Sequence, residues 1–115
     1  MHYSRPVLPI RPDVPTVDVD EAATRHAAGA RLIDVREPVE WDAGHVAGSE
    51  LFPMSTITEW YGDLDPGQEL LVICRTGNRS ASVVEALIRQ AEFTAAHNVA
   101  GGIVAWVEAD LPVER

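Results

Sequence analysis

Residues 69–74, ELLVIC, constrain the fold more than any other part of this sequence. Apolar residues follow one another there without polar alternation, and the turn signal Asp65-Pro66-Gly67 precedes them. A strand of this kind needs cover on both faces, which parallel sheets obtain from the helices that cross over between their strands. The segment therefore predicts a buried strand at the centre of an α/β domain.

Helical spacing follows this strand. From Arg79 or Ser80 onward, apolar residues recur at intervals typical of a helix with one buried face. That stripe consists of Val83, Val84, Leu87, Ile88 and Ala91. An earlier helix is expected over residues 21–28, because Asp18 and Glu21 resemble a capping box and Gly29 closes its C-terminal end.

Further strands and helices alternate along the chain. The other expected strands are residues 16–19, 31–35, 49–52 and 97–99, and the other expected helices are residues 56–64, capped by Ser55, and residues 101–109. Residues 36–49 are expected to form a surface connection with one helical turn at residues 38–41. The alternation predicts a mainly parallel sheet covered by helices on both faces.

The 115 residues suffice for one domain of ordinary size. Residues 1–14 contain prolines spaced by three, which cannot form a helix interior, so this segment is expected to be an extended arm. Residues 15–115 are expected to form the domain. No apolar run approaches the length of a membrane span, and the N-terminus does not resemble a secretory signal, which predicts a cytoplasmic protein.

The formal net charge is -9, which disfavours nucleic acid and anionic membrane surfaces as partners. The single cysteine cannot form an internal disulfide, in agreement with a reducing compartment. The four histidines have no ligand spacing with one another or with the cysteine, so no metal site is expected.

Cys74, the only cysteine, follows directly on the apolar run. It therefore lies at the carboxyl end of the predicted strand, and ligands of open α/β sheets bind at this end of the strands. The loop that follows consists of Arg75, Thr76, Gly77, Asn78 and Arg79. Gly77 permits a positive φ, so the loop amides can turn inward as an anion-binding nest, and the next helix adds its positive pole. A free thiol has a pKa of about 8.5, which such surroundings lower. The pattern predicts a nucleophilic Cys74 in a loop that binds an anionic substrate.

An inert buried cysteine is the alternative interpretation of Cys74, since free cysteines are among the most buried residues. The glycine, the arginines and the strand-to-helix position together favour a catalytic cysteine over an inert one.

Asp34 and Arg36 have the residue types of a catalytic acid and a substrate clamp. A strand-end aspartate more often accepts hydrogen bonds from amides or pairs with an arginine, so a structural role is favoured.

Three segments resemble one known family, in the right order and from about Val17 to Pro112. They are LIDVREPVEWDAGHVAG, VICRTGNRSASVVEAL and NVAGGIVAW, and they are similar to the single-domain rhodanese (thiosulfate sulfurtransferase) family. The resemblance implies a central five-stranded parallel sheet flanked by helices. It implies that Cys74 carries sulfane sulfur as a persulfide and that the amides from Arg75 through Arg79 cradle the outer sulfur. The side chains of Arg75 and Arg79 would favour anionic donors.

The implied reaction is a ping-pong transfer from a donor such as thiosulfate to an acceptor such as cyanide or a thiol. No metal ion or organic cofactor is implied, and His45 would be structural. With a single cysteine, the acceptor must be a small molecule or another protein. A non-catalytic binding or redox-sensing module is the alternative within this family. A cysteine phosphatase is less favoured, because four residues rather than five separate Cys74 from Arg79.

Some positions depart from the usual pattern of the family or have an open assignment. Glu50 and Leu51 alter one short strand, and Glu92 replaces a frequent glycine where a left-handed cap is expected. Gly101 and Gly102 are expected to allow tight backbone packing before the last helix. Residues 60–61, Trp-Tyr, fit either the core or the mouth of a pocket above Cys74.

Overall fold

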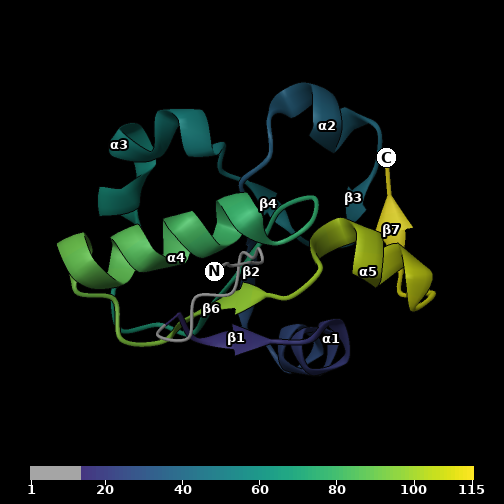
Figure 1. Cartoon of the computed structure of the whole chain (residues 1–115), viewed down its shortest axis with the longest axis horizontal. Coiled ribbons are helices and arrows are strands. Elements are labelled where there is room, and N and C mark those ends of the chain that lie inside the picture. Colours follow the sequence, from purple (N-terminus) through teal and green to yellow (C-terminus); the bar gives the residue numbers. More distant parts are fainter. Residues whose placement is uncertain (1–13) are drawn as a thin grey trace, which may run out of the picture.

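A parallel sheet lies at the centre of the molecule, a computed structural model that describes residues 14–115 (Figure 1). Its strands lie side by side in the order β1 (Thr16–Val17), β6 (Ala96–Val99), β5 (Leu70–Ile73), β2 (Arg31–Asp34) and β4 (Glu50–Leu51). Every neighbouring pair in this sheet is parallel. The structure thus confirms the predicted α/β fold with a five-stranded parallel sheet.

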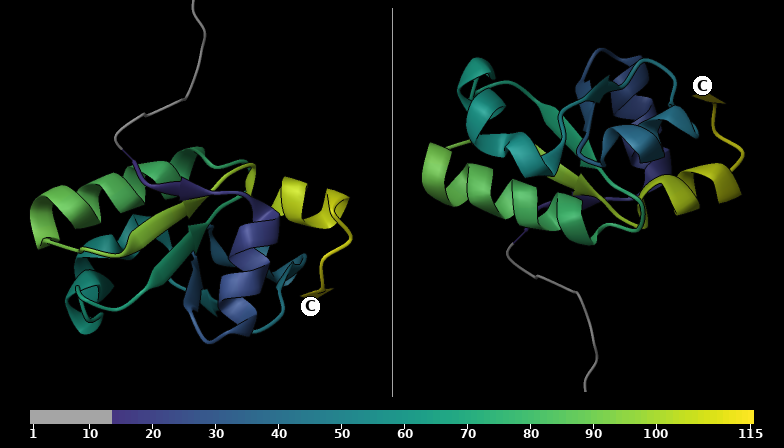
Figure 2. Two further views of the ribbon diagram at one scale, coloured as in Figure 1. Left: turned by 90° about the horizontal axis from the view of Figure 1, so that it is seen from below. Right: turned by 90° about the horizontal axis from the view of Figure 1, so that it is seen from above.

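Helices pack against both faces of this sheet. The helices of the described residues are α1 (Val19–Ala27), α2 (Pro38–Asp42), α3 (Ile57–Trp60), α4 (Asn78–Ala91) and α5 (Gly102–Glu108), with short 3₁₀ helices η1 (Met54–Thr56) and η2 (Tyr61–Asp63) around α3; α2 has no buried residue. One apolar cluster joins the sheet to α3 and α4, and a second joins it to α1 and α5. In the two views of Figure 2, α4 and α1 lie on opposite sides of the strands.

Strand β5 shows why the apolar run predicted this architecture. Leu70 and Val72 belong to the cluster beneath α3 and α4, whereas Leu71 and Ile73 belong to the cluster beneath α1 and α5. All of these side chains are fully buried. A strand covered on both faces has no position for a polar side chain, which explains the absence of alternation.

Two predicted helix starts have different outcomes. The Asp18 carboxylate accepts a hydrogen bond from the backbone N–H of Glu21 at 2.8 Å, which confirms the cap of α1. The predicted cap at Ser55 is wrong. Its hydroxyl donates instead to the Glu37 carboxylate at 3.0 Å, and the expected helix over residues 56–64 is divided into α3 and η2.

A small antiparallel sheet was not predicted. Strand β3 (His45–Val46) pairs with β7 (Val113–Glu114) near the end of the chain. Such short strands, far apart in the sequence, leave no periodic pattern. The predicted arm over residues 1–14 lies outside the described residues except for Val14, which is buried in the cluster beneath α4.

Glu92 ends helix α4 with φ +60° and ψ +32°, the left-handed conformation expected at this position. This backbone conformation is costly for a residue with a Cβ, and glycine adopts it freely. We expect Glu92→Gly to raise the free energy of unfolding by about 0.5–1 kcal/mol, because relief of strain outweighs the added freedom of the unfolded chain. Equilibrium unfolding in urea measures the change.

Glu108→Gly serves as the control, because Glu108 is an exposed residue in the last turn of α5. Glycine at a helical position destabilises the fold, so this variant should unfold more easily. A loss of stability in Glu92→Gly of the same size as in the control would contradict the strain at Glu92.

Candidate active site

Cys74 follows the carboxyl end of β5 and lies at the boundary between the core and the loop. The residue is 1% exposed and belongs to the apolar cluster beneath α4. Its Sγ nevertheless accepts hydrogen bonds from the backbone N–H of Gly77 at 3.1 Å and from the Ser80 hydroxyl at 3.3 Å. The sulfur is therefore buried but surrounded by donors on the side of the loop.

Helix α5 holds the loop from behind. The N–H of Ile103 donates to the carbonyl of Cys74 at 2.8 Å, and the N–H of Val104 donates to the carbonyl of Arg75 at 3.2 Å. The carbonyl and the N–H of a trans peptide point in opposite directions. Because the carbonyls face α5, the N–H groups of Arg75 and Thr76 face the opposite way, as an inward-facing loop requires.

Two glycines make this arrangement possible. A Cβ on Gly102 would lie 2.4 Å from the carbonyl oxygen of Cys74, so only glycine lets α5 approach the loop. This confirms the tight backbone packing expected of Gly101 and Gly102. Gly77 has φ +104°, as predicted, and directly precedes α4. Only glycine adopts such a backbone conformation without strain.

Burial and hydrogen bonding act in opposite directions on the Cys74 thiol. Burial raises its pKa, but hydrogen bonds from the Ser80 hydroxyl and from the amides of Ser80, Gly77 and Thr76 lower it, and the net effect is a pKa below the ordinary value. The donors that stabilise the thiolate come from the loop backbone and from one hydroxyl. This is the electrostatic environment of a reactive cysteine rather than an inert one.

Ser80 and its partner Asn98 are site residues that the sequence reasoning missed. Both are buried, and the Ser80 hydroxyl lies 2.5 Å from the Asn98 side-chain oxygen. Asn98 belongs to β6, the strand next to β5. A signal existed, since Ser80 falls on the buried stripe of α4 with Val83, Val84 and Leu87, where a polar side chain needs a partner.

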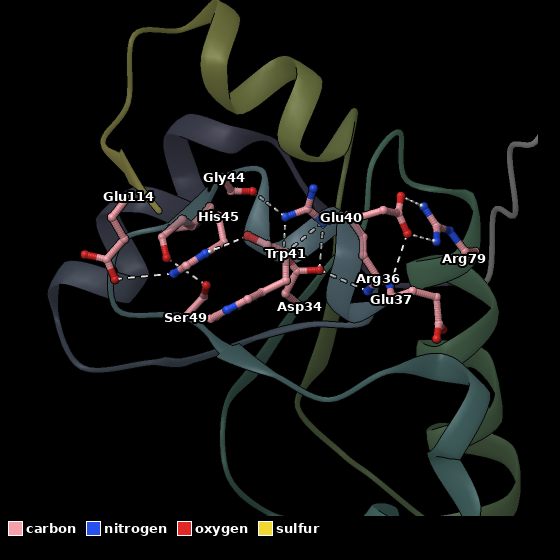
Figure 3. A network of polar contacts seen from close by, with 11 residues as sticks. Asp34, Arg36, Glu37, Glu40, Trp41, Gly44, His45, Ser49, Arg79 and Glu114 are labelled. Carbon is pink, nitrogen blue, oxygen red and sulfur yellow. Dashed lines mark hydrogen bonds and ion pairs between the residues drawn. The ribbon is translucent and has the colours of Figure 1, made fainter.

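The two arginines expected to favour anionic donors, Arg75 and Arg79, differ from each other in their surroundings. Arg75 is exposed, and within residues 14–115 it forms no ion pair or side-chain hydrogen bond. Arg79 forms a bidentate pair with Glu40 of α2, at 2.7 and 2.8 Å (Figure 3). Thr76 and Asn78 are also exposed, at the outer side of the loop.

Asp34 and Arg36 form a buried structural pair beside the loop, as predicted (Figure 3). The Asp34 carboxylate accepts hydrogen bonds from the backbone and the guanidinium of Arg36, which also donates to the carbonyl of Gly44 at 2.7 Å. His45 stacks on Trp41 with ring centroids 3.5 Å apart, and its Nδ1 lies 3.0 Å from the Trp41 carbonyl. These contacts brace the connection between β2 and β3.

Trp60 is buried in the core, where its indole N–H donates to the carbonyl of Pro53 at 2.8 Å. Tyr61 lines a pocket of about 220 Å³ between α3 and α4, whose other lining residues include Ile57, Ala86 and Gln90 but no residue of the Cys74 loop.

Within residues 14–115, no cluster of three or more side chains suits a metal ion. No helix of that part of the chain has the length and apolar character needed to cross a bilayer.

Comparisons with known proteins agree with this geometry. A family model described as a rhodanese-like domain matches residues 18–109. The probable adenylyltransferase/sulfurtransferase MoeZ of Mycobacterium tuberculosis is 43% identical over 79 residues, which are 67% of this chain and 20% of MoeZ. The chain thus spans about a fifth of the length of that relative.

Two further relatives are of similar size to this chain. The thiosulfate sulfurtransferase GlpE of Pseudomonas entomophila is 28% identical over 90 residues, covering 78% of this chain and 82% of GlpE. The crystal structure of a rhodanese-related protein from Thermoplasma volcanium has a TM-score of 0.75 at 31% identity, over 87% of this chain and 97% of that one. From its fold, its Cys74 loop and a match over most of its length, the chain belongs to the rhodanese-like domain family.

Proposed function

We propose that this chain is a sulfurtransferase that moves sulfane sulfur through a persulfide on Cys74. The observation that carries the proposal is the set of donors directed at the Cys74 sulfur, which lowers the pKa of a thiol that burial alone would keep protonated. A thiolate, rather than a thiol, is the nucleophile. Kinship with sulfurtransferases supports the same reaction.

In the first half-reaction, the Cys74 thiolate attacks the sulfane sulfur of a donor such as thiosulfate. A bond forms between Sγ and that sulfur, the sulfur–sulfur bond of thiosulfate breaks, and sulfite leaves with the electron pair. The negative charge then resides on the outer sulfur of the persulfide. The amides of residues 75–79 cradle this charge, assisted by the positive pole of α4.

In the second half-reaction, a thiophilic acceptor such as cyanide or a thiolate attacks the outer sulfur. The new bond forms as the persulfide bond breaks, and Cys74 leaves as the thiolate with which the cycle began. Because Cys74 is the only cysteine of this sequence, the acceptor is a separate small molecule or a separate protein. No metal ion or organic cofactor takes part in this scheme.

Treatment with thiosulfate should add about 32 Da to the intact protein, the mass of one sulfur atom on the nucleophile. Subsequent cyanide should remove the added mass and release thiocyanate. Mass spectrometry of the whole chain measures the first step, and a colorimetric thiocyanate assay measures the second. Cys74→Ser should abolish both signals.

The wild-type chain unfolded in urea serves as the control, since it keeps the thiol but loses the cradle. It should not acquire the added sulfur at a comparable rate. If no adduct forms with thiosulfate or with any persulfide donor in the folded protein, the proposed function is wrong. A chain that instead oxidises at Cys74 without accepting sulfur would support the redox-sensing alternative.

The rate of alkylation of Cys74 should depend on pH with a lower midpoint in the folded chain than in the unfolded one. The hydrogen bonds that lower the pKa exist only in the fold, so the thiolate fraction rises at lower pH there. The thiolate accordingly adds stability above the pKa of the unfolded thiol, and this contribution is lost as the pH falls through the folded pKa. Iodoacetamide alkylation followed by mass spectrometry gives the midpoint.

Ser80→Ala should raise this midpoint, because burial of Cys74 persists while its hydroxyl donor is lost. Ser82→Ala provides the matched control, since Ser82 lies on the same helix and is not among the donors to the Cys74 sulfur. Equal midpoints in the two variants would show that the Ser80 hydroxyl does not stabilise the thiolate.

A further inference from the structure

Three arginines follow the carboxyl ends of the neighbouring strands β2 and β5, and two of them form an ion pair with a carboxylate. Arg36 is paired with the buried carboxylate of Asp34. Arg79 is paired with Glu40. Arg75 has no ion-pair partner within the described part of the chain and is exposed. Of these three cations, Arg75 alone has no carboxylate partner in the described residues.

The pair between Glu40 and Arg79 is bidentate. Nη1 and Nη2 of Arg79 donate to the two carboxylate oxygens of Glu40, in the fork geometry that gives strong charge-assisted bonds (Figure 3). Glu40 also accepts the backbone N–H of Glu37 at 3.0 Å, at the start of α2. The pair with Arg79 lowers the pKa of Glu40 to about 2, so this carboxylate remains charged near neutral pH.

This pairing limits the charge that the loop can accept. A dianion such as thiosulfate brings two negative charges beside a thiolate, in a protein whose net charge is -9. One free guanidinium and the loop amides balance only part of that charge. A donor with one negative charge, or none, meets less repulsion at the same sulfur.

We infer that Glu40 is a specificity-determining residue: it neutralises Arg79 and thereby favours sulfur donors that carry no more than one negative charge. The inference rests on the proposed sulfur transfer and names the donor class for it. Small hydropersulfides, R–S–S–H, belong to this class. Glu40 acts through Arg79 and does not itself contact the transferred sulfur.

The step with such a donor is balanced without an oxidant or a reductant. The Cys74 thiolate attacks the outer sulfur of R–S–S–H, a new bond to Sγ forms, and the sulfur–sulfur bond of the donor breaks. The departing R–S⁻ takes the proton that the outer sulfur carried and leaves as a thiol. The persulfide on Cys74 keeps one negative charge, as it does after reaction with thiosulfate.

Glu40→Gln removes the charge of Glu40 while keeping an oxygen that can accept the N–H of Glu37. Glu50→Gln is the matched control, because Glu50 forms the same bidentate pair with Arg31, at 2.8 and 2.9 Å. Arg31 lies at the opposite end of β2 from the loop, paired in register with Leu70. Each variant changes the net charge equally.

The first measurement does not require sulfur transfer. Sulfate, an unreactive dianion, and nitrate, a monoanion, are tested for protection of Cys74 against iodoacetamide at constant ionic strength. In Glu40→Gln, the sulfate concentration for half-protection should fall about threefold to tenfold, because the freed guanidinium can bind the dianion. The nitrate concentration for half-protection should fall less, since a monoanion gains half of the Coulomb energy that a dianion gains from the same guanidinium.

Glu50→Gln should leave the protection by either anion unchanged. The double variant Glu40→Gln/Arg79→Gln should lose the gain for sulfate, because the gain requires the freed Arg79. The inference would be overturned if the half-protection concentrations of sulfate and nitrate fell equally in Glu40→Gln. It would also be overturned if the tighter binding of sulfate persisted in the double variant. Thermal unfolding of each variant shows whether the fold is kept.

The second measurement compares donors by the rate of persulfide formation. In the wild type, kcat/KM should be higher for the persulfide of 2-mercaptoethanol than for thiosulfate. In Glu40→Gln, the ratio of the two kcat/KM values should decrease, because the KM for thiosulfate falls. An unchanged preference would contradict the assigned role of Glu40. Failure of every donor to load Cys74 would instead refute the sulfur transfer, and the protection experiment would still test the charge balance at Arg79.

Discussion

The hydrogen bonds between the amides of α5 and the carbonyls of Cys74 and Arg75 determine the geometry of the whole site. They lie behind the loop, and they orient its peptide planes so that the N–H groups of Arg75 and Thr76 point away from α5. Gly102 makes them possible, because any side chain there would collide with the Cys74 carbonyl. The Cys74 loop is therefore positioned by a helix that begins well after it in the sequence.

The same arrangement explains why a buried thiol has a lowered pKa. A thiol in the core would normally remain protonated, because a low dielectric disfavours charge. The donors on the loop side compensate for this, and most of them are backbone amides that need no particular side chain. Backbone donors also have no rotamer freedom to lose, so the preorganised loop costs little when charge develops on the sulfur. Ser80 adds the one side-chain donor, whose single hydrogen is shared between the Cys74 sulfur and the Asn98 side-chain oxygen of the neighbouring strand.

Local patterns in the sequence predicted those features that depend on neighbouring residues. The unbroken apolar run at β5 indicated cover on both faces, the stripe along α4 indicated a helix, and Gly77 indicated the positive φ. Features that join distant segments were missed, including the pairing of β3 with β7. The ion pair between Glu40 and Arg79 spans 39 positions, and neither residue has a spacing that points to the other. Ser55 has the residue type of a cap, but it lies inside η1, and its hydroxyl donates to the Glu37 carboxylate.

The near-complete burial of Cys74 has a geometric consequence for any reagent that meets it. With 1% of the residue accessible, a partner cannot lie alongside the sulfur or bring a crowded interior atom to it. Reaction is restricted to molecules whose reacting atom is unhindered, such as a terminal sulfur or the methylene carbon of a small alkylating reagent. A disulfide buried within a folded protein offers no unhindered sulfur, so it does not reach this cysteine, whatever its redox potential.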